Sequence, residues 1–75
     1  MKIFSWNVNG LRAIARKGFA DILEAEAPDI VCLQETKIRK DQLNDHLTEI
    51  GHYKSYFSEA EKKGYSGVAI YTLHE

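Results

Sequence analysis

The apolar run Ile30-Val31-Cys32-Leu33 constrains the fold of this 75-residue chain more than any other feature. Pro28 stands just before the run and ends any preceding helix, because the residue before a proline is biased away from the α region. A short, continuous apolar run is typical of a strand that is buried on both faces of a parallel sheet. We therefore expect a strand over residues 30–33 and an α/β fold.

The segment before this run predicts a parallel partner for it. Residues 2–8 are rich in β-branched and aromatic residues and stop at an Asn-Gly turn, which indicates a strand. The next residues carry apolar side chains at helical spacing, but Gly18 interrupts the stripe, so we expect a short turn over 11–16 and a firmer helix over 19–26. Strand, helix and strand in succession make a β-α-β unit.

The second half of the chain predicts a helix and a β-hairpin. Leu43, Leu47 and Ile50 recur at helical spacing, and a glycine follows as a C-terminal stop. Residues 53–57 and 68–73 have the composition of strands and are separated by a polar loop. We expect both strands to take pairing partners from later sequence.

Composition is that of an ordinary globular protein. Apolar residues make up 44% of the sequence and charged residues 28%, which is unlike a disordered chain. No apolar run approaches the roughly 20 residues of a membrane helix, no signal peptide opens the chain, and Cys32 has no second cysteine to pair with. We expect a cytoplasmic protein in a reducing compartment, without membrane association, and with Cys32 buried and inert.

The near-neutral net charge hides an asymmetry between the two halves. Residues 1–40 hold seven basic and five acidic residues, net +2, whereas residues 41–75 hold three basic and six acidic residues, net −3. Such an asymmetry is ordinary solvated surface unless the basic side chains converge, in which case they position phosphate groups without reading a base sequence. Six basic residues follow the ends of the two predicted parallel strands: Arg12, Arg16, Lys17, Lys37, Arg39 and Lys40.

Polar side chains follow the ends of the same two strands. Asn7 and Asn9 close the first strand and Glu35 follows the second, and ligands of open α/β sheets bind outside the carboxyl ends of the strands. A carboxylate beside carboxamides suits Mg²⁺, which takes oxygen ligands and keeps several waters. Two plainer interpretations stay open here: turn chemistry for the asparagines, and an exposed ion pair of Glu35 with Lys37 or Arg39.

A basic, glycine-flanked loop over residues 62–67 presents Tyr65. The tyrosine ring is suited to stack on a sugar or base, and its hydroxyl to bond a phosphate. The alternative is an ordinary hairpin tip.

Three segments of the chain, taken in order, resemble one known family. They are Ile3–Ala13 (IFSWNVNGLRA), Pro28–Lys37 (PDIVCLQETK) and Gly64–Ala69 (GYSGVA). Together they resemble the exodeoxyribonuclease III class of apurinic/apyrimidinic (AP) endonucleases, within the endonuclease/exonuclease/phosphatase superfamily. The resemblance covers the whole chain but only the first part of such an enzyme, which implies that residues 1–75 are the incomplete N-terminal segment of a four-layered α/β sandwich.

The resemblance also implies a function. Members of the class are Mg²⁺-dependent DNA-repair nucleases, with Mn²⁺ as a substitute metal, that hydrolyse the phosphodiester 5′ to an abasic site and act as 3′-exonucleases and 3′-phosphatases. The implied partner is double-stranded DNA with abasic sites or 3′ ends, and the implied state of the complete enzyme is a monomer. The remaining catalytic groups of the family come from later segments, and His74 does not belong to its late histidine motif. The 75 residues alone are therefore expected to be inactive.

The resemblance assigns roles to individual residues. Glu35 matches the metal-binding glutamate, and Asn7 matches the asparagine of the active-site hydrogen-bond network near the metal. Asn9 stands where some relatives carry aspartate, which implies a weaker, neutral contact, and with Lys37 it is included among the DNA-binding candidates. The other positions that match DNA-contacting residues are Arg12, Ala13, Lys17 with Arg16 as its alternative, Gly64 and Tyr65.

Two other functions stay open. A phosphodiesterase of the same superfamily that acts on a phospholipid or inositol phosphate shares the fold, although the segments Leu11–Ala13 and Gly64–Val68 favour the DNA enzyme. The other alternative is a non-catalytic 75-residue product, either truncated or acting as a small metal- or nucleic-acid-binding module.

Overall fold

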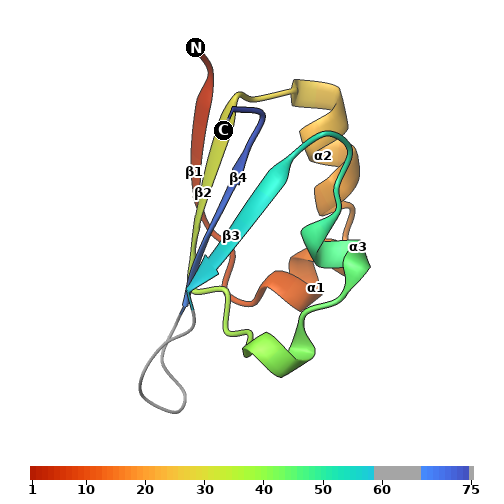
Figure 1. Ribbon diagram of the computed structural model, residues 1–75, viewed down its shortest axis with the longest axis vertical. Coiled ribbons are helices and arrows are strands. Elements are labelled where there is room, and N and C mark those ends of the chain that lie inside the picture. Colours follow the sequence, from red (N-terminus) through yellow and green to blue (C-terminus); the bar gives the residue numbers. More distant parts are fainter. Residues whose placement is uncertain (59–66, 75) are drawn as a thin grey trace.

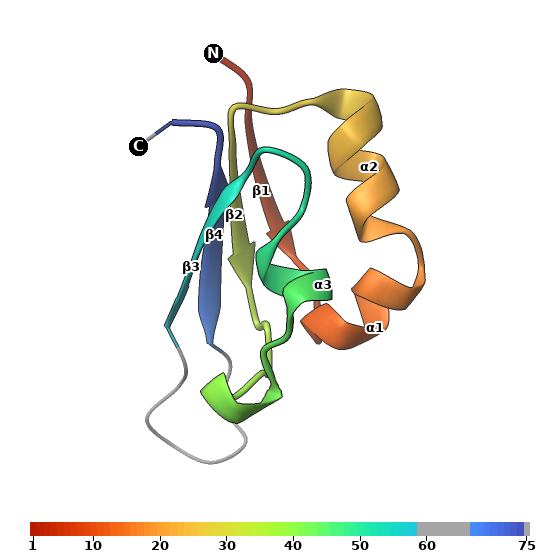
Figure 2. The ribbon, with the colours of Figure 1, turned by 45° about the vertical axis from the view of Figure 1, so that its right-hand side comes forward.

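A sheet of four strands forms one layer, and the described helices form a second layer on one of its faces (Figures 1 and 2). The computed structural model describes residues 1–58 and 67–74, without the side chain of Lys40. The predicted α/β class is confirmed. In chain order the elements are β1 (Ile3–Asn7), α1 (Leu11–Arg16), α2 (Phe19–Glu26), β2 (Ile30–Gln34), the 3₁₀ turn η1 (Lys40–Gln42), α3 (Asp45–Thr48), β3 (Lys54–Ser58) and β4 (Val68–Thr72).

The strand order in the sheet is β1-β2-β4-β3. β1 and β2 are parallel and in register, with Asn7 opposite Gln34, so the predicted β-α-β unit is confirmed. β3 and β4 are antiparallel, which confirms the hairpin. The expectation that the strand over 68–73 needs a later partner is wrong, because β4 also pairs antiparallel with β2 and so has a neighbour on each side.

Two residues with positive φ set the ends of the first helices. Gly18 has a φ of 99°, which an L side chain rarely adopts, and this residue separates α1 from α2 as predicted. Ala27 ends α2 in the left-handed conformation with a φ of 45°, and its N–H donates to the carbonyl of Leu23 at 2.9 Å. Pro28 then prevents further helix, as expected.

The helix predicted around Leu43, Leu47 and Ile50 is much shorter than its spacing indicates. Only Asp45–Thr48 is α-helical. Asn44 is extended (φ −142°) and is the N-cap residue of this helix, so Leu43 lies outside it. The inward direction of the apolar residues is nevertheless as predicted: Leu47 and Ile50 are buried, and Leu43 packs against the core. Burial of these side chains, rather than a continuous helix, accounts for the pattern.

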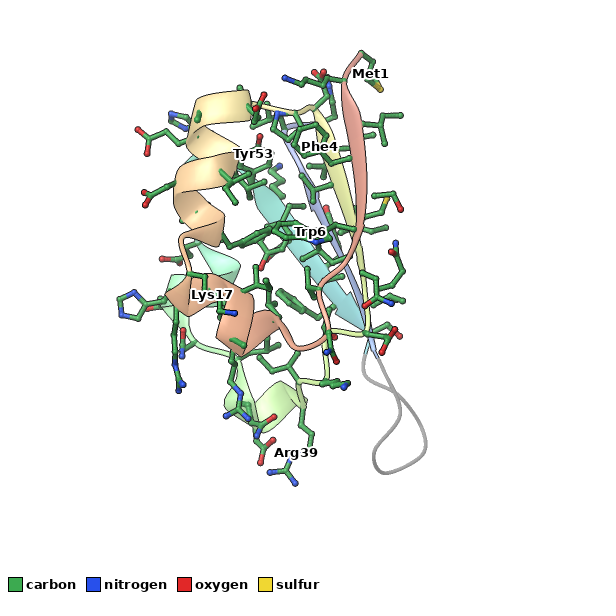
Figure 3. The ribbon with its side chains drawn as sticks, turned by 180° about the vertical axis from the view of Figure 1, so that it is seen from behind. Met1, Phe4, Trp6, Lys17, Arg39 and Tyr53 are labelled. Atoms are coloured by element: carbon green, nitrogen blue, oxygen red, sulfur yellow. The ribbon has the colours of Figure 1, made fainter. Side chains whose placement is uncertain are left out.

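Aromatic rings fill the space between the two layers. Phe4 and Trp6 project from β1 towards the helices (Figure 3). Phe19 of α2 lies 6.1 Å from the Trp6 ring and 5.4 Å from the Tyr71 ring, measured between centroids. Tyr71 of β4 is fully buried, and its hydroxyl donates to the carbonyl of Leu47 at 2.5 Å, which ties α3 to the sheet.

The other face of the sheet has no covering layer in the part of the chain that the structure describes. Ile3, Tyr56, Val68 and Ile70 are exposed there. The predicted burial of β2 on both faces is therefore wrong for these residues: its side chains alternate between buried and half-buried, and Cys32 is half-buried on the open face. No helix of residues 1–58 and 67–74 is long and apolar enough to cross a membrane.

Candidate functional site

Asn7 and Glu35 meet at the carboxyl ends of β1 and β2. Asn7 is the last residue of β1, and Glu35 follows the last residue of β2. The Nδ2 group of Asn7 donates a hydrogen bond to Oε2 of Glu35. The parallel register continues just beyond the strands, where the N–H of Val8 donates to the carbonyl of Gln34 at 3.1 Å. The predicted proximity of the two side chains is confirmed, and their roles stay predictions.

The backbone around Glu35 is held from both sides. Gly10 and Leu11, at the start of α1, donate from their N–H groups to the carbonyls of Glu35 and Thr36, each at 2.8 Å. The N–H of Thr36 donates to the carbonyl of Gly67, just before β4, at 3.1 Å. The exit of β2 is therefore tied to β1, α1 and β4 at once, which fixes where the Glu35 carboxylate lies.

A chain of hydrogen bonds leads from Glu35 to Lys37. The backbone N–H of Asn9 donates to Oδ1 of Asn7 at 3.1 Å, and Nζ of Lys37 donates to Oδ1 of Asn9 at 2.6 Å. The asparagines therefore do form a local turn hydrogen bond, from the Asn9 N–H to the Asn7 side chain, and this bond is part of the site. An ion pair of Glu35 with Lys37 or Arg39 is not formed, because Arg39 faces Asp41 at 3.4 Å and Lys37 bonds Asn9.

Beside this network lies a small cationic pocket of about 330 Å³. Four of the predicted DNA-binding residues line it: Arg12, Ala13 and Arg16 of α1, and Lys37 after β2. Gly10 and Thr36 complete the lining. Three cationic side chains, Arg12, Arg16 and Lys37, line the same pocket, so these basic residues converge. The interpretation of the charge asymmetry as ordinary solvated surface therefore does not hold for them.

The other predicted DNA-binding residues do not join this pocket. Asn9 bonds Lys37 but does not line the pocket, and Lys17 follows the end of α1 and is exposed outside it. Arg39, one of the six basic residues after the strand ends, extends away from the sheet (Figure 3). Gly64 and Tyr65 lie outside the described residues.

Thr36 and Gly10 line the pocket without having been singled out from the sequence. Thr36 is buried, and its hydroxyl finds no hydrogen-bond partner among residues 1–58 and 67–74. Its position between Glu35 and Lys37 was the available signal, but only the structure shows that the intervening side chain points inward.

The donor set fits a hard cation held by few protein ligands. No group of three or more His, Cys, Asp or Glu side chains capable of holding a metal occurs in the described ranges. Glu35 supplies a carboxylate at this edge, and the amide oxygens of Asn7 and Asn9 lie nearby. Mg²⁺ is commonly bound in this way, by one or two carboxylates, waters and substrate phosphates, whereas zinc needs several nitrogen or sulfur ligands.

Known proteins are similar to this chain in sequence and in fold. Residues 4–74 match the profile of the Endonuclease/Exonuclease/phosphatase family. An exodeoxyribonuclease of Bacillus subtilis (strain 168) is 49% identical over 76 residues, covering 100% of this chain and 29% of the relative. An AP endonuclease from Archaeoglobus fulgidus superposes with a TM-score of 0.83 at 35% identity, over 100% of this chain and 28% of its own. The 3′ phosphatase NExo from Neisseria, bound to a product DNA hairpin, has a TM-score of 0.78 at 33% identity, over 97% of this chain and 27% of its own.

The chain spans less than a third of the length of each of these proteins. The matched region includes β1, β2 and the loops after them, which carry Asn7, Glu35 and the cationic pocket. The family resemblance of the three sequence segments is confirmed. The chain therefore belongs to the Endonuclease/Exonuclease/phosphatase family, and the relatives it resembles are AP endonucleases and exodeoxyribonucleases.

Proposed function

We propose that the complete protein is a Mg²⁺-dependent DNA-repair nuclease in which residues 1–75 supply the metal ligand and part of the DNA-binding surface. Its reactions are hydrolysis of the phosphodiester 5′ to abasic sites and removal of nucleotides or phosphate from 3′ ends. The observation that carries the proposal is the bond between Asn7 and Glu35 beside a pocket with three cationic side chains. Relatives named exodeoxyribonuclease, AP endonuclease and 3′ phosphatase support it.

Each side chain of the site has a distinct task in this proposal. Glu35 would hold Mg²⁺, and the bound ion would supply positive charge at a phosphoryl oxygen of the substrate. Asn7 orients the Glu35 carboxylate, since its amide donates to one carboxylate oxygen while its own oxygen is held by the Asn9 N–H. Arg12 and Arg16 neutralise phosphates of the DNA backbone and so fix the register of the duplex.

The substitution Glu35→Gln tests the proposal in the protein expressed from its complete reading frame. Glutamine keeps the shape and an oxygen that can accept the Asn7 hydrogen bond, but it removes the carboxylate charge that would hold the metal. We expect kcat/KM on abasic-site DNA to fall by about 100-fold or more at low Mg²⁺, because losing a charged metal ligand removes several kcal/mol of charge stabilisation.

The matched control is Asp41→Asn, which neutralises an exposed carboxylate outside the site. This variant should retain the parent Mg²⁺ dependence. Near-normal rates of Glu35→Gln at low Mg²⁺ would sink the assignment of Glu35, and no cleavage of abasic-site DNA by the parent protein in Mg²⁺ above an EDTA control would sink the proposed function.

A further inference from the structure

A groove among the described residues lies near the end of the sheet opposite the Asn7–Glu35 contact. It measures about 810 Å³ and is situated between α2, α3 and the segment that leads into β3. Tyr53 lines it, and the Tyr53 hydroxyl donates to the carbonyl of Pro28, at the amino end of β2. Asn7 and Glu35 lie at the carboxyl ends of the strands, roughly 16 Å away for a five-residue strand. The Tyr53 end of the groove is therefore remote from the contact between Asn7 and Glu35.

The floor and rim of the groove differ in character. Buried Leu23 and Ile50 form part of the floor, and Leu73, which is 42% exposed, extends the apolar surface to the end of β4. The rim is acidic, because Glu24 of α2 and Glu49 after α3 are exposed on opposite sides of the groove. Asp45 adds a third carboxylate, and neither lysine nor arginine is part of the lining. This rim accounts for part of the acidic surplus of the second half of the sequence, which the DNA site leaves unexplained.

We propose that this groove binds a cationic amphipathic helix of a partner protein. An apolar groove between two helices is the surface on which amphipathic helices dock, with apolar anchors at i, i+3/i+4 and i+7. The acidic rim is complementary to lysine or arginine flanks, and its sign repels nucleic acid and anionic membrane surfaces. α2 has eight residues, about 12 Å in length, so the groove accommodates two to three turns of a partner helix.

A second, smaller hollow determines which way the partner helix lies in the groove. It measures about 450 Å³, shares Ala20, His46 and Ile50 with the acidic groove, and is lined by Arg12 and Arg16 at its far end. A bound helix therefore places its cationic turn over Glu24 and Glu49, and its uncharged or acidic end points towards the arginines of α1. The proposal rests on the groove alone and does not depend on nuclease activity.

Fluorescence anisotropy with a synthetic probe tests the proposal on the protein expressed from its complete reading frame. The probe is a labelled helical peptide with leucine at i, i+3/i+4 and i+7, lysine in the turn at one end and uncharged residues at the other, and the comparison peptide has glutamate in place of lysine. We expect saturable binding of the lysine peptide alone. The double substitution Glu24→Lys/Glu49→Lys should weaken this binding by about 10-fold, because each carboxylate changes from attraction to repulsion.

Two matched pairs of variants locate the binding. Asp41→Lys makes the same change of charge per residue outside the groove, and it should leave the affinity unchanged. Ala20→Gln places a longer side chain in the groove and should abolish binding, whereas Ala25→Gln, exposed on the same helix but outside the lining, should not. Urea unfolding of each variant establishes that it is folded. Absence of binding, equal binding of both peptides, or equal losses in Asp41→Lys and the groove variants would overturn the proposal.

Discussion

Replacing asparagine by aspartate at two positions of the site should have opposite effects. In Asn7→Asp, the amide that donates to Oε2 of Glu35 becomes a carboxylate, so a hydrogen bond is replaced by two like charges in contact. In Asn9→Asp, the oxygen that accepts from Nζ of Lys37 at 2.6 Å becomes charged, so a neutral hydrogen bond becomes an ion pair. The same chemical change therefore destabilises at one position and stabilises two residues later.

The magnitude of the Asn7→Asp effect follows from the contact and its exposure. Two like unit charges about 4 Å apart repel by about 1 kcal/mol in water and about 4 kcal/mol at an effective dielectric constant near 20. Asn7 is exposed and Glu35 half-buried, which favours the lower value. Loss of the hydrogen bond adds about 0.5–1.5 kcal/mol. We expect the free energy of unfolding to fall by about 2 kcal/mol at neutral pH without metal.

Metal and pH should each reverse this loss. If Glu35 holds Mg²⁺ as proposed, the carboxylate introduced by Asn7→Asp would add a second ligand, and Mg²⁺ should stabilise the folded variant in proportion to the logarithm of its concentration. Because the neighbouring negative charge raises the pKa of the introduced carboxyl group in the folded protein, the deficit is full at neutral pH and shrinks as the pH falls and that group is protonated. Asn9→Asp, with Lys37 and Asn9 both exposed, should gain at most about 1 kcal/mol.

The assay is equilibrium urea unfolding of the complete protein at several pH values, with EDTA and with millimolar Mg²⁺. Equal stability of Asn7→Asp and the parent at neutral pH in EDTA would refute the contact between Asn7 and Glu35. A deficit that Mg²⁺ does not reduce would refute the metal site, even if the contact itself were present.

Two further predictions concern charged side chains outside the Asn7–Glu35 contact. The pKa of Asp29 is lowered by the hydrogen bond from the Lys2 backbone N–H and by His74, so its contribution to stability is present above the ordinary value of 3.8 and is lost as the pH falls through the lowered one. Asp29→Asn should accordingly show a shallower loss of stability in acid, and an unchanged acid profile by urea unfolding would contradict this. Arg12→Gln should weaken DNA binding several-fold for all sequences and reduce the salt slope of log K by about 1, whereas Arg39→Gln, outside the cationic pocket, should change neither in a filter-binding titration.

Local sequence patterns were sufficient to predict the parallel half of the sheet. Pro28 and Gly18 act on the backbone directly through restricted or positive φ, so the break between α1 and α2 and the end of α2 could be located from residue type. The position of β4 between β2 and β3 could not, because pairing partners distant in sequence leave no local signature. The break in the expected helix at Asn44 could not be predicted either. The spacing of apolar residues indicates which side chains face inward, whether or not the backbone between them is helical.

The site was predictable to the extent that strand register determines it. Parallel strands place their carboxyl ends at one edge, and this alone brings Asn7 to Glu35. The bond between Lys37 and Asn9 required the conformation of the turn after β2, which the sequence does not reveal. For the same reason Lys17 could not be separated from Arg16 by spacing, although only Arg16 lines the cationic pocket.

Backbone strain at this edge indicates why these residue types occupy it. Among the described residues, four non-glycine residues have positive φ, and three of them belong to the site: Asn9 at 46°, Glu35 at 53° and Lys37 at 52°. Such a conformation costs a non-glycine residue about 1–2 kcal/mol, and glycine would avoid that cost. Glycine, however, would remove the carboxylate and the ammonium group, and an unstrained extended backbone would direct successive side chains to alternate faces of the sheet. The strained turn instead lets Lys37 reach Asn9 while Glu35 reaches Asn7, so its cost is compensated by a network that only charged and amide side chains can form.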